Sequence, residues 1–288
     1  MKKRILILGI NGMAGHILSL YFRSLSQEFK TFGIARNDSV MKPSQLLDAT
    51  DFDKLKRVIE NIKPDYIVNS IGVLNQYAEN FPANAILVNS YLPHFLESLT
   101  KDSPVKVIHI STDCVFSGKK GGYIESDFRD GKGYYGQSKA LGELNNQKDV
   151  TLRTSIIGPD INRKGIGLFQ WFMQQDTVAN GYVKSIWSGV TTLELAKAVH
   201  RSIVSDTKGI YHITNGQKIN KYELLKLFKH GAQKNIFIRE VDGIALDKSL
   251  IDTRKEFNYQ VPNYDIMIKE MIDMMKENKS LYPTYEIE

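Results

Sequence analysis

A chain of 288 residues with 42% hydrophobic and 24% charged residues can bury a sizeable core, and it suits one large domain or a main domain with a smaller one. The net charge of +6 is modest, and no dense Lys/Arg tract interleaved with aromatics indicates nucleic acid. The single cysteine, Cys114, excludes an intrachain disulfide framework and a metal site built from several cysteines.

No apolar run approaches the roughly 20 residues of a membrane span. The basic N-terminus resembles the beginning of a signal peptide. The apolar stretch after it is too short for a signal peptide, however, and it is soon followed by Asn11-Gly12. The six histidines show no metal-ligand spacing. We therefore expect a cytoplasmic protein without membrane or nucleic-acid partners and without a metal site.

The first predicted elements are a strand over residues 5–8 and a helix that begins near residue 13, with a glycine-rich turn between them. This succession is the context that a dinucleotide-binding fingerprint requires. Gly9 permits the tight turn, Gly12 lets the backbone approach a pyrophosphate, and Gly15 allows close helix packing. The spacing is G-x-x-G-x-x-G, and a bland glycine-rich turn is the alternative interpretation. The flanking elements favour a cofactor site.

A second strand is predicted over residues 31–35, and Arg36 follows it directly. An acidic residue at this place would hydrogen-bond a ribose 2′-OH, whereas an arginine accommodates a 2′-phosphate. The sequence therefore predicts NADPH as the cofactor, with NADH as the alternative. A solvated loop charge is the competing interpretation of Arg36.

Strands and helices continue to alternate through the first half of the chain. Further strands are predicted over 65–70, 105–110 and 150–153, and helices over 52–62, over 83–99 with a fresh start or kink at Pro93, and over 135–144. This alternation predicts a doubly wound parallel sheet with helices on both faces. Ligands on such sheets sit beyond the carboxyl ends of the strands. Those ends carry the glycine turn, Arg36, Ser70 to Gly72, Ser111-Thr112 and Thr154-Ser155.

The pattern loosens after residue 157. A strand is predicted over 209–213, and helices are predicted over 193–203, 221–229 and 264–276, with a poorly ordered tail from Leu281. We expect an α/β Rossmann domain over 1–153, with return segments at about 190–213, and a smaller α/β substrate-binding lobe mainly over 154–288.

Tyr135 and Lys139 stand four residues apart on a predicted helix, and residues at this spacing share a helix face. A lysine ammonium beside a tyrosine hydroxyl stabilises the phenolate and lowers a pKa that is ordinarily about 10. Such a tyrosine serves as a proton donor or acceptor near neutral pH. Tyr-x-x-x-Lys alone is weak evidence, but here it follows a hydroxyl pair, Ser111-Thr112, at the end of a predicted strand.

The fingerprint, the hydroxyl pair and Tyr-x-x-x-Lys, in this order, resemble those of the extended short-chain dehydrogenases/reductases. The chain more narrowly resembles the dTDP-4-dehydrorhamnose reductase branch, in residues 111–118, 152–155 and 187–196. The resemblance implies an enzyme that uses NAD(P)H to reduce the C4 keto group of a nucleotide-linked 4-keto-6-deoxyhexose in surface polysaccharide precursor synthesis. It further implies that Thr112 hydrogen-bonds the keto oxygen, that Tyr135 donates the proton, and that Lys139 holds the nicotinamide ribose.

Two sets of site residues follow from the motifs and the resemblance together. The predicted cofactor-binding residues are Gly9, Asn11, Gly12, Met13, Gly15, Arg36, Asp48, Ala49, Ser70, Ile71, Gly72, Tyr135 and Lys139. The predicted substrate-binding residues are Asn75, Thr112, Asp113, Cys114, Tyr135, Ser155 and Trp187. A helix cap is the alternative for Asp48, and packing within the lobe is the alternative for Trp187. Asn89 has two interpretations, support of an active-site water or a plain polar helix position.

The chain departs from the family's pattern next to Thr112. Dehydratases of the wider family place Asp-Glu there, and a thiol at Cys114 cannot readily replace that Glu, which argues against 4,6-dehydration. Close rhamnose reductases usually carry Tyr at the place of Cys114. This position would border the sugar, so we expect a substrate other than the rhamnose precursor. The resemblance to reductases of surface-polysaccharide pathways favours a UDP-linked 2-acetamido-2,6-dideoxy-4-hexulose over dTDP-4-dehydrorhamnose. A mildly basic chain would attract either anionic substrate.

Two other functions stay open at this stage. One is an NAD-dependent nucleotide-sugar 4-epimerase of the same fold. The other is a non-catalytic NADP-binding regulatory subunit, since one relative of this branch serves a methionine adenosyltransferase in that way. Intact Thr112, Tyr135 and Lys139 weigh against the regulatory role. The expected partner is a nucleotide-sugar substrate, and a homodimer is left open.

Overall fold

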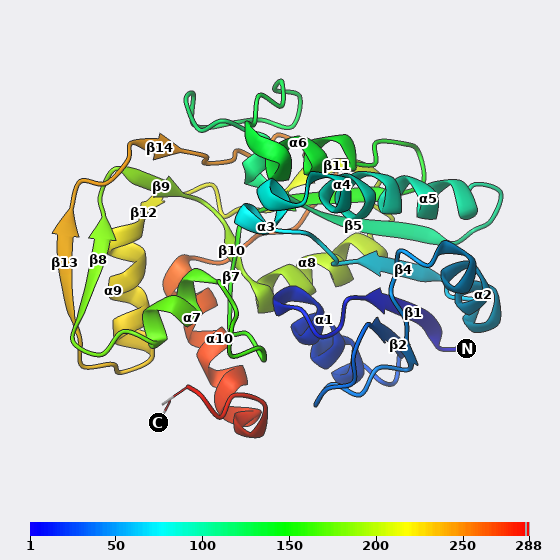
Figure 1. The fold of residues 1–288 in the computed structure, drawn as a ribbon, viewed down its shortest axis with the longest axis horizontal. Helices are drawn as coiled ribbons and strands as arrows, with labels where there is room; N and C mark the ends of the chain where they lie inside the picture. The colour runs from blue at the N-terminus through cyan, green and yellow to red at the C-terminus, as the bar shows by residue number, and fades with distance from the viewer. Residues whose placement is uncertain (286, 288) are drawn as a thin grey trace.

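A seven-stranded parallel sheet forms the centre of the computed structural model, which describes residues 1–285 and 287 (Figure 1). The strand order is β11-β6-β5-β4-β1-β2-β3, and every neighbouring pair is parallel. The strands are β1 (Lys3–Leu8), β2 (Phe29–Ala35), β3 (Gln45–Leu46), β4 (Tyr66–Asn69), β5 (Lys106–Thr112), β6 (Val150–Thr154) and β11 (Gly209–His212). The order reverses between β1 and β4, so the predicted doubly wound fold is confirmed.

Helices cover both faces of this sheet, which explains why its strands are continuously apolar. Alternate residues of β1 serve opposite faces: Ile5 and Ile7 lie in one hydrophobic cluster, and Leu6 and Leu8 lie in another. The first cluster includes residues of α1 (Met13–Ser24) and α8 (Thr192–Val204), and the second includes residues of α2 (Phe52–Ile62) and α5 (Leu92–Leu99). α6 (Gly133–Leu141) contacts β5.

The helical run predicted around Pro93 consists of three consecutive segments. They are α4 (Pro82–Ala85), a π-helical segment η1 (Ile86–Tyr91) and α5, which has Pro93 in its first turn. Proline lacks an N–H and crowds the preceding turn, and a π-helical turn absorbs the register change without ending the helix. The expected irregularity therefore lies just before the proline. π-Helical turns are frequent at functional sites, and this one carries Asn89.

A second structural unit contains elements that sequence reasoning found only in part. Its helices are α7 (Leu168–Met173), α9 (Lys221–Gly231) and α10 (Tyr264–Glu277), and its strands are β8 (Val178–Tyr182), β9 (Ser185–Trp187), β12 (Ile219–Asn220), β13 (Phe237–Val241) and β14 (Leu246–Asp247). β13 pairs with β8, and β9 lies between β12 and β14 (Figure 1). These strands are short and half-exposed, so no apolar run marks them. The domain boundary at residue 153 stays a prediction.

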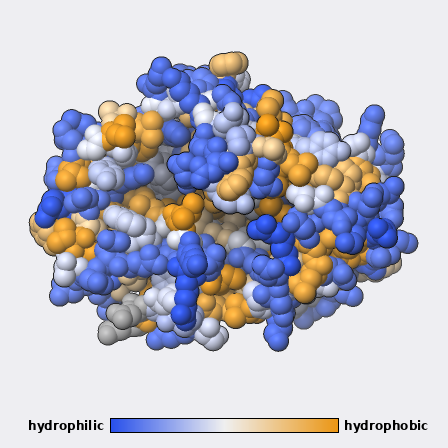
Figure 2. Space-filling view, in the orientation of Figure 1, coloured by the Kyte–Doolittle hydropathy of each residue, from blue (hydrophilic) through white to orange (hydrophobic). Residues whose placement is uncertain are grey.

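Several short elements complete the chain. They are α3 (Asn75–Asn80), the 3₁₀ turns η2 (Asp113–Val115) and η3 (Lys279–Leu281), and the paired strands β7 (Ile156–Ile157) and β10 (Val190–Thr191). Thr191 caps α8 by accepting from Glu194 N at 3.1 Å. Hydrophobic side chains are interspersed with hydrophilic ones over the face seen in Figure 2. No helix within the described residues is long and apolar enough to cross a membrane.

The prediction of a poorly ordered tail from Leu281 is wrong for the residues that the structure describes there. Tyr282 is buried, and its hydroxyl lies 3.0 Å from His16 Nε2 in α1. Tyr285 accepts a hydrogen bond from Asp160 N at 2.8 Å. Tyrosine combines a large apolar ring with a polar tip, so two of them suffice to anchor the end of the chain. Residues 286 and 288 lie outside the described part of the chain.

Candidate active site

The glycine turn after β1 has the geometry that a dinucleotide phosphate needs. Gly9 has φ +87°, a conformation that side chains with a Cβ rarely adopt. A Cβ on Gly15 would lie 2.0 Å from the Gly9 carbonyl oxygen, so only glycine lets α1 approach the turn this closely. Gly12 is exposed at the N-cap of α1, and no side chain caps the helix. The uncapped N–H groups of the first turn are therefore available to a phosphate.

The loop after β4 lies directly against this turn. Ser70 donates to the Leu8 carbonyl at 2.6 Å, and a Cβ on Gly9 would lie 2.9 Å from Ile71 Cγ1. Ile71 N in turn donates to Asn69 Oδ1 at 3.3 Å. The structure therefore brings the predicted segment Ser70 to Gly72 beside the glycine fingerprint, at the carboxyl ends of β1 and β4.

Asn11 connects the glycine turn to the loop that carries Arg36. Its amide nitrogen donates to Asn37 O at 2.7 Å, and its oxygen accepts from Ser39 Oγ at 2.5 Å. Arg36 itself is exposed at the end of β2. Asn11 thus fixes the loop next to the cofactor turn while the Arg36 guanidinium stays open to a ligand.

Asp48 does not cap a helix, which corrects one of its two predicted roles. Its carboxylate accepts from Thr50 N at 3.0 Å and from Thr50 Oγ1 at 2.8 Å, in the turn before α2. The cap of α2 is Asp51, which accepts from Lys54 N at 3.2 Å. Ala49 is buried, and half-buried Met13 points towards Gly167, where a Cβ would lie 2.9 Å from its sulfur.

The candidate catalytic groups meet at the carboxyl end of β5. Thr112 ends this fully buried strand and begins η2: its hydroxyl accepts from Cys114 N at 3.1 Å and donates to Asp113 Oδ1 at 3.1 Å. The side chain of Tyr135, from the first turns of α6, lies close enough to Thr112, Asp113 and Cys114 for all three to act on its pKa. A Cβ on Gly136 would lie 2.4 Å from the Cys114 carbonyl oxygen, so this glycine lets α6 approach η2.

Lys139 does not stabilise a Tyr135 phenolate in this structure, which corrects the predicted effect on the tyrosine. The Lys139 ammonium donates to the Ile110 carbonyl at 2.6 Å and lies 3.2 Å from His109 Nε2. A buried strand carbonyl is a strong acceptor and holds the ammonium against the sheet, although both side chains start from the same helix face. Burial lowers the pKa of Lys139 to about 8, and Glu143 opposes this shift.

The pKa of Tyr135 is raised above its ordinary value. Burial is the main cause, and Cys114 and Asp113 act in the same direction, whereas the nearby hydroxyl of Thr112 lowers the pKa. Burial also raises the pKa of Asp113 and raises the pKa of Cys114 to about 11. Tyr135 is therefore held as the neutral phenol, which is the form that donates a proton.

Ser111 and Thr112 face opposite sides of β5, so only the threonine reaches the candidate site. Ser111 donates to Glu143 Oε1 at 2.6 Å, and Arg153 clamps the same carboxylate from Nε at 2.8 Å and from Nη2 at 2.7 Å. All three side chains are buried. Sequence reasoning missed this cluster, and its one signal was an acidic and a basic residue inside a predicted helix and the strand that follows it.

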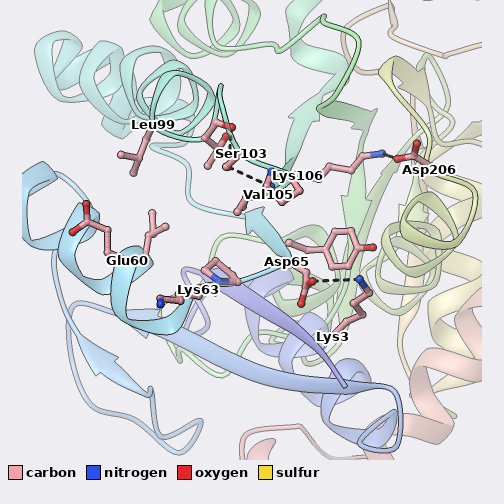
Figure 3. Close-up of a pocket in the computed structure, with 14 residues that line it drawn as sticks. Lys3, Glu60, Lys63, Asp65, Leu99, Ser103, Val105, Lys106 and Asp206 are labelled. Carbon is pink, nitrogen blue, oxygen red and sulfur yellow. Dashed lines mark hydrogen bonds and ion pairs between the residues drawn. The ribbon is translucent and has the colours of Figure 1, made fainter. Parts of the chain in front are cut away.

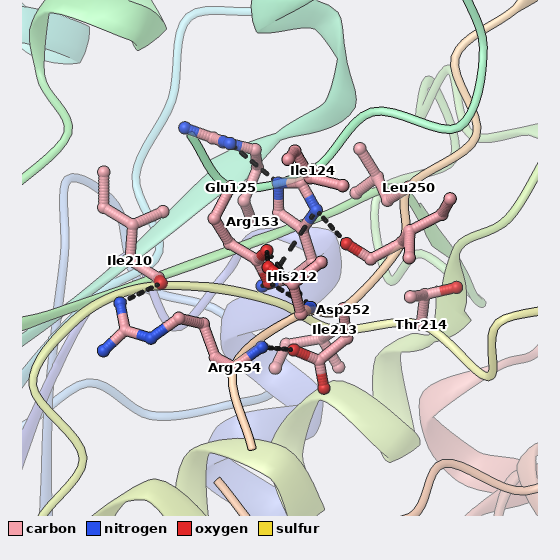
Figure 4. Close-up of polar contacts among 12 residues, drawn as sticks. Ile124, Glu125, Arg153, Ile210, His212, Ile213, Thr214, Leu250, Asp252 and Arg254 are labelled. Atoms are coloured by element: carbon pink, nitrogen blue, oxygen red, sulfur yellow. Dashed lines mark hydrogen bonds and ion pairs between the residues drawn. The ribbon is translucent and has the colours of Figure 1, made fainter. Parts of the chain in front are cut away.

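The buried network continues from Arg153 towards the second unit (Figure 4). Arg153 Nη1 lies 2.7 Å from His212 Nε2, and His212 Nδ1 lies 2.9 Å from the Ile251 carbonyl oxygen. The backbone N–H of His212 donates to Glu125 Oε1 at 3.2 Å, and Thr253 Oγ1 donates to the other oxygen at 2.5 Å. These contacts tie β6, β11 and the segment after β14 into one polar assembly under the site.

Asn89 has a structural role that neither predicted interpretation described. Its amide donates to Val73 O at 2.9 Å and to Ser138 Oγ at 3.0 Å, and its oxygen accepts from Val73 N at 2.8 Å. The side chain is completely buried in η1. It therefore fastens the loop after β4 to α6, on which Tyr135 and Lys139 stand.

The remaining predicted substrate-binding residues differ in burial and in the elements that they contact. Asn75 is exposed at the start of α3, with φ +43°, and α3 contacts α6. Ser155 is half-buried and accepts from Val190 N through its carbonyl at 2.9 Å. Trp187 is buried, and its ring centroid lies 5.6 Å from that of Tyr264. The structure thus places the indole in the core of the second unit, which is the packing alternative.

A lysine that sequence reasoning missed reaches the predicted substrate side. Lys248, just after β14, donates from Nζ to Cys114 Sγ at 3.3 Å. The two residues are 134 positions apart, and no local pattern marked Lys248.

A cavity of about 660 Å³ lies at the other end of the parallel strands, and none of the predicted site residues line it (Figure 3). It is lined at the amino ends of β1, β4 and β5 by residues that include Lys3, Asp65, Tyr66 and Lys106. Parallel sheets bind ligands beyond the carboxyl ends of their strands. We therefore locate the candidate site at the glycine turn and Thr112.

Comparison with known proteins gives a consistent set of relatives. The family model described as RmlD substrate binding domain matches residues 2–255. The chain is similar to a dTDP-4-dehydrorhamnose reductase of Burkholderia thailandensis, 30% identical over 74% of this chain and 72% of the relative. It is also similar to a dTDP-4-keto-6-deoxy-D-glucose reductase of Streptomyces niveus, 27% identical over 79% and 78%. A methionine adenosyltransferase 2 subunit beta of Xenopus tropicalis is 25% identical over 77% and 70%.

A solved structure shares the same fold over almost its whole length. It is a dTDP-4-dehydrorhamnose reductase of Bacillus anthracis in complex with NADP, with a TM-score of 0.81 and 22% identity over 95% of this chain and 100% of the other.

Proposed function

The chain belongs to the family of the RmlD substrate binding domain, and we propose that it uses NADPH to reduce the C4 keto group of a nucleotide-linked 4-keto-6-deoxyhexose. The observation that carries this proposal is that Thr112 and Tyr135 lie together at the carboxyl end of β5, beside a dinucleotide turn. Reductases that act on dTDP-linked keto sugars are among the relatives, which supports the same reaction class.

The roles of the three candidate catalytic residues follow from their chemistry. Thr112 orients the keto oxygen through its hydroxyl, and the neutral phenol of Tyr135 donates a proton to that oxygen as it becomes an alcohol. Lys139 presents a buried cation to the ribose hydroxyls of the cofactor. NADPH, when bound, supplies the hydride. Asp113 and Cys114 directly follow Thr112 and lie on the substrate side of the site, where they select the sugar.

The uncapped start of α1 and the glycines of the turn fit the pyrophosphate of a dinucleotide. Arg36, Asp48 and Ala49 are proposed for the adenosine half, and Ser70 to Gly72 for the neighbouring ribose. A fold neighbour in complex with NADP supports the choice of the phosphorylated cofactor.

Replacing Arg36 with Ala is expected to raise KM for NADPH by about 10- to 100-fold, because a charge-assisted contact to the 2′-phosphate is lost. KM for NADH should change less than about threefold, since NADH lacks this phosphate. Steady-state kinetics with both cofactors test this. Equal effects on both cofactors would contradict the assignment of Arg36 to the 2′-phosphate.

NADPH affinity is expected to be constant below about pH 7 and to weaken as the pH rises through about 8. Burial lowers the pKa of Lys139 to about 8, so the ammonium that holds the ribose loses its proton as the pH rises through this value. Fluorescence titration of NADPH between pH 6.5 and 9.5 measures the effect. Lys139→Met should bind more weakly and show no break near pH 8. An unchanged wild-type affinity up to pH 9.5 would contradict the role of Lys139.

As the sugar substrate, we propose a UDP-linked 2-acetamido-2,6-dideoxy-4-hexulose in preference to dTDP-4-dehydrorhamnose. Cys114 is a small side chain beside Thr112, so it leaves room for a substituent on the sugar ring. The enzyme is to be incubated with NADPH and a panel of dTDP- and UDP-linked 4-keto-6-deoxy sugars, with NADPH oxidation and product NMR as readouts. Turnover of at least one sugar to its C4 alcohol is expected.

A regulatory subunit is the second candidate, because subunits of methionine adenosyltransferase are among the relatives. This role predicts NADP binding without oxidation of NADPH by any keto sugar. The same panel therefore separates the two functions.

A further inference from the structure

The ammonium of Lys248 lies beside Cys114, on the substrate side of the candidate site, and has N–H donors that remain available to a ligand. Among the described residues, its one hydrogen-bond partner is Cys114 Sγ at 3.3 Å, and sulfur is a weak acceptor. Within residues 1–285 and 287, no carboxylate lies within 4.0 Å of this ammonium. A lysine ammonium has three N–H donors, so two remain for a ligand.

The chain on both sides of Lys248 is fixed to the body of the protein. Asp247 N donates to the Gly118 carbonyl at 2.9 Å, and Leu250 N donates to Ser188 Oγ at 2.7 Å. A Cβ on Gly118 would lie 3.0 Å from Lys248 Cγ, so the aliphatic stem passes close over this glycine. The backbone around Lys248 and the start of its side chain are therefore held in place beside the candidate site.

The charge of Lys248 acts on the groups beside Thr112. Burial raises the pKa of Asp113, and Lys248 is the main charge that opposes this shift, with Lys221 acting in the same sense. Both lysines come from the second unit, Lys248 after β14 and Lys221 at the start of α9. This side of the site therefore presents cations to a substrate that approaches Thr112.

We propose that Lys248 is a specificity-determining residue that donates a hydrogen bond to an oxygen-bearing substituent of the sugar on the carbon next to the keto group. This inference rests on the proposed function. Cys114 N donates to Thr112 Oγ1 at 3.1 Å, so the residue that Lys248 contacts is also in contact with the hydroxyl that orients the keto oxygen. In a nucleotide-linked 4-keto hexose the diphosphate is bonded to C1, across the ring from C4, which favours a sugar contact over a phosphate contact for a residue beside Thr112.

Lys248→Met tests this assignment because it keeps the length of the stem and removes the ammonium. With a keto sugar that carries a hydroxyl or acylamino group next to C4, kcat/KM is expected to fall about 10- to 100-fold. With the analogue that is deoxy at that carbon, it should change less than about threefold. Lys248→Arg should recover part of the loss. Lys184→Met removes an exposed cation of the same unit and should have no effect.

Titration of the same variants with free UDP and dTDP distinguishes a sugar contact from a phosphate contact. Unchanged nucleotide affinity in Lys248→Met supports the proposal, and a tenfold loss would overturn it in favour of the diphosphate. Equal losses with the substituted and the deoxy sugar would overturn it as well. A wild-type enzyme that turns over no sugar would overturn the proposed function and this inference together, whereas an active wild type with an unaffected Lys248→Met overturns only the inference.

Discussion

Replacing Tyr135 with Phe is expected to lower kcat by about 10²- to 10⁴-fold, the usual contribution of a general acid. The phenol is kept protonated because burial, Cys114 and Asp113 raise its pKa, so the hydroxyl is the proton donor within reach of a keto oxygen held by Thr112. Phe keeps the ring that packs against Val73 and Ala78. NADPH affinity, measured by fluorescence, should therefore change little while turnover collapses.

Tyr134 provides a matched control on the same helix. It precedes Tyr135 directly, but its side chain is exposed, and Tyr134→Phe should leave kcat within about twofold of the wild type. A Tyr135→Phe enzyme with near-normal turnover would exclude Tyr135 as the acid. Equal losses in both variants would indicate a general disturbance of α6.

The parts of the site that the sequence predicted share one property: each is encoded by neighbouring residues. Gly9, Gly12 and Gly15 follow a short apolar strand and carry their backbone requirements locally. Thr112 ends a buried strand, so its place at the sheet edge follows from the alternation of elements. Strand order and the meeting of these loops follow from the handedness of parallel crossovers.

The parts that the sequence could not predict depend on contacts between distant segments. Lys248 reaches Cys114 across 134 positions, and Tyr282 reaches His16 across 266. The orientation of Lys139 is a different case, because its spacing to Tyr135 was correct. The Lys139 ammonium binds the Ile110 carbonyl and not the phenol because of how the helix and the strand pack together. The sequence spacing of Tyr135 and Lys139 carries no information about that packing.

Replacing Arg153 with Met is expected to destabilise the protein by about 3–5 kcal/mol, because it leaves Glu143 charged and buried. Burial opposes ionisation of Glu143, but Arg153, Ser111 and Arg129 together hold the pKa of its carboxyl below the ordinary value. The midpoint of urea unfolding, followed by far-UV circular dichroism at pH 7, measures the loss. Since Ser111 precedes Thr112 and donates to the same carboxylate, kcat should fall along with stability.

The exposed partner of the same carboxylate is the control for this experiment. Arg129 contacts Glu143 Oε2 at 3.1 Å with a side chain that is 42% exposed, so Arg129→Met should cost less than about 1 kcal/mol. The double variant Glu143→Met/Arg153→Met should regain much of the loss, because no buried charge remains. The deficit of Arg153→Met should also shrink as the pH falls from 7 to 5, since an unpaired buried Glu143 has a raised pKa and takes up a proton. A deficit that is independent of pH, or equal for both arginines, would show that the network contributes packing alone and that charge pairing beneath Thr112 does not support the site.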